Sequence, residues 1–208
     1  MKREIDWKET VSINNNCLRA YLIGSIEHTG KNDNGAGWRK ELTPQLNARG
    51  IYCFDPVSLE EKKISMPQED FLQKLVNVRK NGRMSFFMEN MEKIWKGLDI
   101  IEEENGKPIA KRILGDLGYT TNSDFLVFNL HADDKPGGSI IEMSYAHQAG
   151  IPTYMITDVP LYKLNSSILY FILDSGRGQG GVFKSQDDFL EFLEEKYNLK
   201  ERKHFIQQ

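Results

Sequence analysis

The sequence is poor in cysteine, in long apolar runs and in positive charge. Its 208 residues include two cysteines, Cys17 and Cys53, too few and too isolated for a disulfide framework or a structural zinc site. No stretch approaches the roughly 20 consecutive apolar residues that span a bilayer. The start, MKREIDWKET, lacks an apolar signal region. We therefore expect a soluble protein of the reducing cytoplasm with no membrane partner.

Several common functional signatures are also missing. The 27 basic and 30 acidic residues give no basic field, and the aromatic residues do not interleave with stripes of Lys or Arg. A nucleic-acid polymer is therefore not expected as a partner. There is no Walker A loop, no GxSxG elbow and no zinc-ligand spacing among the histidines. Kinase, serine-hydrolase and metal-dependent functions lose support, and no metal or cofactor is expected.

The most informative segment runs from 123 to 157 and has the pattern of a βαβ unit. The apolar run at 125–128 predicts a strand buried on both faces. Helical spacing follows from 140 to 149 and stops at Gly150, and 152–156 predicts the next strand. The loop before the helix therefore lies at the carboxyl end of a parallel strand, where open α/β sheets bind ligands.

Small residues and one carboxylate stand where this helix is expected to begin. Gly137 and Gly138 allow backbone N–H groups to approach a ligand closely. Ser139 occupies the expected N-cap position, so the helix start favours an anion. Glu142 follows just inside the helix. It is either a surface residue stabilised by the helix dipole or, because apolar residues flank it on both sides, a functional residue of a largely buried helix.

An earlier βαβ unit precedes this one. Residues Leu18 to Ile23 predict a strand that runs into Gly24 and Ser25, again a turn where the backbone can touch a ligand. A helix and a strand at 51–54 follow. Pro44 predicts either a kink in that helix or a shorter helix that starts there.

Together these units predict an α/β fold of the Rossmann-like, flavodoxin-like kind, a doubly wound parallel sheet flanked by helices in a single domain at 1–199. We expect a helical insertion at about 60–110 and a charged tail at 200–208. Apolar residues at helical spacing between 71 and 98 predict core-facing stripes, which also suit a contact in a homo-oligomer. The acidic run at 99–109 is expected to be a solvated connection.

The remaining segments carry weaker patterns. A short helix is expected at 110–117 and another at 167–174, followed by a flexible linker at 176–181. Ser185 and Asp188 form a capping box that predicts the start of the last helix.

Three acidic positions lie near predicted strand ends, namely Asp116, the Asp133-Asp134 pair and Glu142. If the first and third strands are neighbours in the sheet, these carboxylates share one pocket with Tyr21. Several carboxylates, a tyrosine and an anion-friendly helix start suit attack on an anomeric carbon. In that chemistry one carboxylate is the nucleophile and another group protonates the leaving group.

Three segments resemble a known family: YLIGSI at 21–26, DLGYTTNSDFLV at 116–127 and GGSIIEMSYA at 137–146. They are similar, in this order, to the opening strand, the two-aspartate segment and the nucleophile helix of the nucleoside 2-deoxyribosyltransferase family. That family includes the 2'-deoxynucleoside 5'-monophosphate N-glycosidases. With the strand after Gly150, the resemblance covers roughly two-thirds of the chain.

The resemblance implies cleavage or transfer at the N-glycosidic bond of a small-molecule nucleoside or nucleotide. Glu142 would be the nucleophile that forms a deoxyribosyl-enzyme intermediate, and Tyr21 would hold it in position. Asp116 would bind the sugar hydroxyls, and Asp134 or Asp133 would assist protonation of the leaving base. The substrate-binding residues that it implies are Gly24, Ser25, Asp124, Gly137, Gly138 and Ser139.

The family divides by substrate phosphate and by sugar acceptor. Ser25 and Ser139 match positions that bind phosphate in the monophosphate glycosidases, which favours a nucleotide substrate; alternatively, the first only finishes a turn and the second only caps a helix. The chain departs from the family pattern at Ser144, where the family has glycine, and in a loop before the nucleophile that is longer by about two residues.

Two other functions stay open on the sequence alone. A ribosyl–nicotinamide bond presents the same anomeric chemistry, so the substrate could be NAD. A non-catalytic Rossmann-like module that senses a nucleotide is the second alternative. The family resemblance further implies a homo-oligomer in which a neighbouring subunit completes the site. Recognition of the base is expected from the loop at 26–37 and from the middle region at 57–110, which does not match the family.

Overall fold

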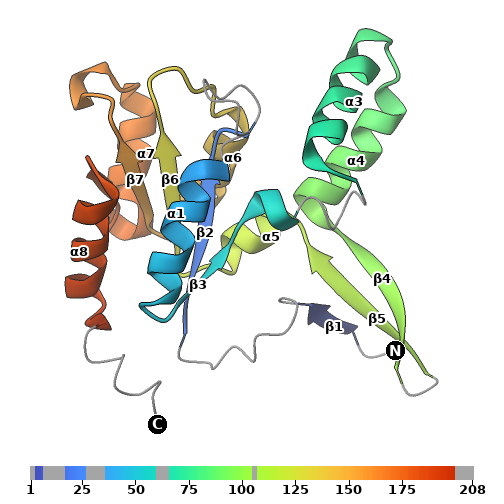
Figure 1. Ribbon diagram of the computed structural model, residues 1–208, viewed down its shortest axis with the longest axis horizontal. Coiled ribbons are helices and arrows are strands. Elements are labelled where there is room, and N and C mark those ends of the chain that lie inside the picture. Colours follow the sequence, from blue (N-terminus) through green and yellow to red (C-terminus); the bar gives the residue numbers. More distant parts are fainter. Residues whose placement is uncertain (1–2, 7–16, 27–35, 60–65, 105–106, 200–208) are drawn as a thin grey trace. The chain divides into compact units, whose positions relative to one another are not determined.

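The computed structural model describes residues 3–6, 17–26, 36–59, 66–104 and 107–199. The chain forms two compact units (Figure 1). The first comprises Met1–Asn15 and Pro56–Tyr119, and the second comprises Asn16–Asp55 and Thr120–Gln208. The charged tail and most of the loop at 26–37 lie outside the described residues.

The second unit contains the predicted parallel sheet. Its strands follow the order β3-β2-β6-β7-β8, and every neighbouring pair is parallel. This is the flavodoxin-like order of an open, doubly wound sheet, so the predicted fold class is confirmed. The first and third predicted strands, β2 and β6, are neighbours in this sheet, which was the condition for a shared pocket. The strands are β2 (Leu18–Gly24), β3 (Ile51–Phe54), β6 (Phe125–Leu130), β7 (Thr153–Thr157) and β8 (Gly181–Phe183).

Helices cover both faces of this sheet. Helices α1 (Ala36–Asn47) and α8 (Gln186–Lys196) pack on one face, where Leu42, Leu46 and Phe189 join a single apolar cluster with sheet residues (Figure 1). Helices α6 (Gly137–Gln148) and α7 (Ser166–Gly178) contact each other and the strands β6 and β7 on the other face. The sheet is therefore buried on both sides, which explains why its strands are continuous apolar runs.

Alternation along β2 assigns its side chains to these two faces. Ala20 and Leu22 belong to the cluster beneath α1 and α8. Because successive side chains of a strand point to opposite faces, Tyr21 points to the face covered by α6. The helix α6 contacts β2 there. This alternation decides which side of the sheet each candidate site occupies.

The predicted helix cap and helix end are present in the structure, and the predicted linker at 176–181 is the exception. Ser185 caps α8 by accepting a hydrogen bond from the Asp188 backbone N–H, and helical geometry in α7 ends before Ser175. Helix α1 continues through Pro44 to Asn47, so the shorter helix that would start at this proline is not formed. The predicted flexible linker at 176–181 is wrong at its end, because Gly181 already pairs with β7 in the short strand β8.

The first unit is more than the expected helical insertion. Helices α3 (Gln68–Lys80) and α4 (Met84–Lys96) pack their apolar stripes on each other, which confirms the core-facing stripes. A three-stranded sheet of order β1-β5-β4 accompanies them. Its strands are β1 (Arg3–Asp6), β4 (Gly97–Glu104) and β5 (Lys107–Leu114), and α5 (Asp116–Thr121) follows.

Two predictions for this region are wrong. The run at 99–109 is not a solvated connection, and the segment at 110–117 begins as a strand and not as a helix. The strands β4 and β5 pair antiparallel from Gly97 with Leu114 onward, and Arg112 forms an ion pair with Asp99 across the ladder at 3.2 Å. Charged residues therefore line a paired hairpin, as they commonly do on exposed strands.

No helix within the described part of the chain is both long enough and apolar enough to cross a membrane.

Candidate functional site

Tyr21 and Glu142 meet on the α6 face of the sheet. The Tyr21 hydroxyl donates a hydrogen bond of 2.7 Å to Oε1 of Glu142. Tyr21 is fully buried, and Glu142 is 6% exposed. A buried carboxylate requires hydrogen-bond donors to offset the loss of hydration, and a tyrosine fixed in a strand supplies one at a defined position. The two residues lie 121 positions apart in the sequence.

Glu142 lies deeper in its helix than the sequence suggests. The helix begins at Gly137 with Pro136 at the N-cap position, and Ser139 is a buried residue inside it. The prediction that Ser139 caps the helix is therefore wrong. Glu142 falls in the second turn, whereas the helix dipole stabilises charges mainly within the first turn. The reading of Glu142 as a dipole-stabilised surface residue is thus excluded by its position and its burial.

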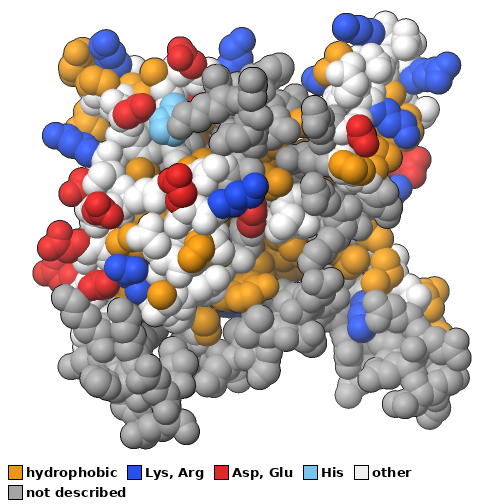
Figure 2. Space-filling model, viewed as in Figure 1, with side chains coloured by type: hydrophobic (Ala, Val, Ile, Leu, Met, Phe, Trp, Pro, Cys, Tyr) orange, Lys and Arg blue, Asp and Glu red, His pale blue; other side chains and the backbone are white. Residues whose placement is uncertain are grey.

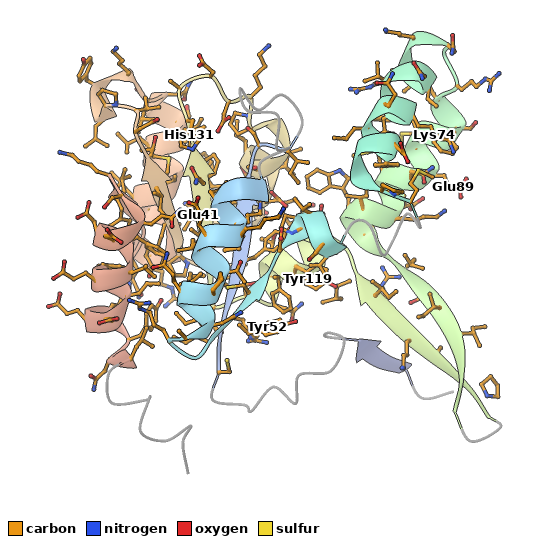
Figure 3. The ribbon with its side chains drawn as sticks, in the orientation of Figure 1. Glu41, Tyr52, Lys74, Glu89, Tyr119 and His131 are labelled. Carbon is orange, nitrogen blue, oxygen red and sulfur yellow. The ribbon has the colours of Figure 1, made fainter. Side chains whose placement is uncertain are left out.

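Asp133 and Asp134, in the loop between β6 and α6, have different surroundings. Asp134 Oδ2 accepts a hydrogen bond of 2.9 Å from the backbone N–H of His131, which closes a short turn. Asp133 is exposed. His131, labelled in Figure 3, has its Nδ1 3.1 Å from Oδ2 of Asp158, which follows the end of β7. A role of Asp134 or Asp133 in protonating the leaving base stays a prediction.

Asp116 and Asp124, the two aspartates of one predicted segment, have different surroundings. Asp116 is buried and begins α5 in the first unit. Its binding of the sugar hydroxyls stays a prediction. Asp124 precedes β6 and accepts hydrogen bonds of 2.7 Å and 3.3 Å from the backbone N–H and the Nε of Arg19. These contacts lie at the amino ends of β2 and β6, the edge opposite to Gly24.

Asp124 is therefore not brought to the ligand-binding edge of the sheet, and its contacts serve to fix the start of β6 against β2.

Gly24 and Ser25 lie at the carboxyl end of β2. A Cβ on Gly24 would lie 3.0 Å from the Asn129 carbonyl oxygen and 3.3 Å from the Trp38 ring. A larger residue would thus push α1 away from the sheet. The Ser25 side chain is buried, and its Oγ has no hydrogen-bond partner among the described residues. A buried hydroxyl without a partner is uncommon in folded proteins, and binding of a substrate by Ser25 stays a prediction.

Asn129 is a residue of interest that the sequence analysis missed. It lies near the end of β6, is 5% exposed, and its Oδ1 has no hydrogen-bond partner among the described residues. The available signal was an amide inside an otherwise apolar strand. Across the described ranges, no group of three or more His, Cys, Asp or Glu side chains could hold a metal ion.

Among the comparisons with known proteins, the comparison with solved structures gives a match. No protein-family model matches the sequence, and no curated protein does. The chain is similar to a solved 2-deoxyribosyltransferase from the psychrotolerant bacterium Bacillus psychrosaccharolyticus, with a TM-score of 0.44 and 12% identity. The match covers 83% of this chain and 90% of that one. Function is therefore inferred below from the residues of this chain.

Proposed function

We propose that this chain cleaves or transfers at the N-glycosidic bond of 2'-deoxynucleosides or their 5'-monophosphates, with Glu142 as the nucleophile. The observation that carries the proposal is the 2.7 Å hydrogen bond from Tyr21 to the buried Glu142 carboxylate. The carboxylate cannot be explained by the helix dipole, and it lies on a helix that follows a parallel strand, as active-site residues of open α/β sheets do.

The reaction proceeds by two displacements. A Glu142 carboxylate oxygen forms a bond to C1' of the sugar while the bond from C1' to the base nitrogen breaks. The departing base takes up a proton, for which Asp134 and Asp133 are the proposed donors. A water molecule or a second base then attacks C1' and releases Glu142, so that the configuration at C1' is retained. Tyr21 keeps the carboxylate oriented in both steps.

The other proposed roles concern substrate binding. Asp116 binds the sugar hydroxyls. Ser25 and Ser139, with the backbone around Gly24, Gly137 and Gly138, bind a 5'-phosphate. The unpartnered Oγ of the buried Ser25 supports this role, because the hydroxyl could donate a hydrogen bond to a phosphate oxygen. We do not assign Asp124 to the substrate, since its carboxylate is engaged by Arg19.

The proposal is tested by following base release chromatographically. The protein is incubated with each 2'-deoxynucleoside and each 5'-monophosphate, with and without a second free base. Base released from a monophosphate without an acceptor identifies an N-glycosidase, and a new nucleoside that forms only with the added base identifies a transferase.

Glu142→Gln is the decisive variant. Its amide oxygen still accepts the Tyr21 hydroxyl, so folding is expected to be preserved while base release is lost. Glu191→Gln makes the same change at an exposed position of α8, and it should retain full activity. Full activity of Glu142→Gln would refute the proposal. Turnover of NAD alone, or tight nucleotide binding without any product, would replace it with the two alternative functions.

We further propose that the protein forms a homo-oligomer. The stripes of α3 and α4 that suggested an oligomer contact are used within the first unit, where Phe71, Leu75 and Ile94 are buried. The second unit offers a different surface, since α6 and α7 expose four large apolar side chains. These are Ile141, Tyr145, Tyr170 and Leu173. Exposed apolar residues grouped on two packed helices are typical of contact surfaces.

A further inference from the structure

A pocket lies at the carboxyl edge of the sheet. It has a volume of about 300 Å³, at the lower end of the range for small-molecule sites. It is formed by the ends of β6 and β7, the first turns of α1 and the start of α8. Its polar and aromatic lining includes Trp38, Glu41, Asn129, His131, Asp158 and Lys184.

This pocket lies on the opposite side of the sheet from Glu142. Val127 of β6 belongs to the apolar cluster beneath α1 and α8, and Asn129, two residues further, faces the same side. Ile156 of β7 belongs to the same cluster and also lines the pocket. Tyr21 points to the other face, where its hydroxyl meets Glu142. The pocket is thus separate from the proposed catalytic pair.

Asn129 is the residue of this pocket that indicates a bound ligand. Its side chain is almost fully buried, lines the pocket and leaves Oδ1 without a hydrogen-bond partner. A buried polar atom left unpaired costs free energy, and a bound molecule would remove that cost. An amide offers a donor and an acceptor side by side. It therefore pairs with a ligand edge that presents an acceptor beside an N–H donor, as asparagine pairs with adenine.

The rest of the lining favours a flat ring that carries an amino group. Trp38 provides an aromatic surface on which a planar ring can stack. The lining contains two carboxylates, Glu41 and Asp158, and one lysine, and His131 Nδ1 lies within hydrogen-bond distance of Asp158. Acidic side chains also gather over α8 on this face of the molecule (Figure 2). The amino group of a substituted ring would donate hydrogen bonds to such carboxylates.

We propose that this pocket binds an amino-substituted heteroaromatic ring of the size of a single nucleobase, held by the Asn129 amide and stacked on Trp38. The binding does not depend on the reaction at Glu142, because the two sites lie on opposite faces of the sheet. It can therefore be tested whether or not the protein cleaves glycosidic bonds.

The experiment is a titration of the full chain with adenine, cytosine and unsubstituted purine, followed by calorimetry and by the indole N–H resonance of Trp38. Trp38→Phe assigns that resonance. Adenine or cytosine should shift it saturably, and purine, which lacks the exocyclic amino group, should bind at least tenfold more weakly than adenine. Absence of any saturable shift with adenine and cytosine at their solubility limits would overturn the proposal.

Variants locate the ligand. Asn129→Leu and Asn129→Asp, the second of which keeps the size but loses the donor, should each weaken binding at least tenfold. Thr153→Val removes another buried hydroxyl without a partner, at the amino end of β7, and should leave the affinity unchanged. Glu142→Gln should leave it unchanged too. Unaltered affinity in both Asn129 variants, or loss of binding in Glu142→Gln, would contradict the proposed location.

Discussion

Replacing Tyr21 by phenylalanine removes a single hydroxyl from the α6 face of the sheet. The hydrogen bond that this hydroxyl donates to Glu142 is 2.7 Å long and buried at both ends. A hydrogen bond to a charged group contributes about 1.5–3 kcal/mol. If the bond orients the nucleophile in the transition state, its loss should lower kcat/KM by about 10- to 150-fold.

Two further measurements separate positioning from general destabilisation. Because the hydrogen bond favours the charged carboxylate, the acid limb of the pH–activity profile should move to higher pH in Tyr21→Phe. The free energy of unfolding, measured by denaturant titration, should fall by about 1–3 kcal/mol. Combining Tyr21→Phe with Glu142→Gln should give non-additive effects on unfolding, since the two side chains are in direct contact.

Tyr154→Phe is the matched control. Tyr154 is fully buried in the same sheet, and its hydroxyl lies 3.1 Å from that of Tyr197 in the cluster beneath α1 and α8. Its removal should cost about 1 kcal/mol of stability and leave base release unchanged. The reasoning is refuted if Tyr21→Phe keeps full activity and an unchanged pH profile, or if Tyr154→Phe loses as much activity.

Three other predictions follow from the described contacts. Burial raises the pKa of the Cys53 thiol from 9.0 to about 12. In a Cys17→Ser variant, thiol labelling of Cys53 at pH 8 should therefore be roughly a thousandfold slower than labelling of an ordinary cysteine. Rapid labelling of the folded chain would contradict this. A Cβ at Gly176, where φ is +60°, would lie 2.8 Å from the proline before β7. Gly176→Ala should therefore destabilise more than Gly178→Ala, which has φ of +79° and open space around it and should cost only about 1 kcal/mol; equal losses in denaturant titration would show that the close contact relaxes freely. Replacing Ile141 and Leu173, which are 46% and 47% exposed, by arginine should reduce the assembly size measured by sedimentation. Replacing the exposed Met84 and Met88 of α4 by arginine should not change it. An unchanged assembly size in the variant of Ile141 and Leu173 would place the interface elsewhere.

The central sheet was predictable because its strands are buried on both faces. The runs at 18–23 and 125–128 are apolar without interruption, and each is followed by small or polar residues. Such runs identify parallel strands with little competition from other structures. The pairing of β2 with β6 was only a condition at that point, and it agrees with the doubly wound order, in which the first strand lies between the second and the third.

The hairpin of the first unit was missed for the opposite reason. β4 contains four charged residues, three of them in succession at 102–104, and β5 contains three, and polarity of this kind usually marks a connection. What pairs them is partly the ion pair between Asp99 and Arg112, which are directly opposed in the ladder. A contact between residues so far apart is invisible to any local pattern. β8 was missed because three residues carry no periodicity.

Glu142 illustrates which properties of the candidate site a local sequence pattern can predict and which depend on a long-range contact. Its flanking apolar residues left two explanations open, and the assumed helix start at Ser139 made the dipole explanation reasonable. The actual start at Gly137 moves Glu142 into the second turn, where the dipole is weak. The hydrogen bond from Tyr21 then fixes the carboxylate relative to the sheet and not only to its own helix. A carboxylate held at a defined position suits the proposed role of Glu142, because a nucleophile requires fixed geometry whereas stability alone does not.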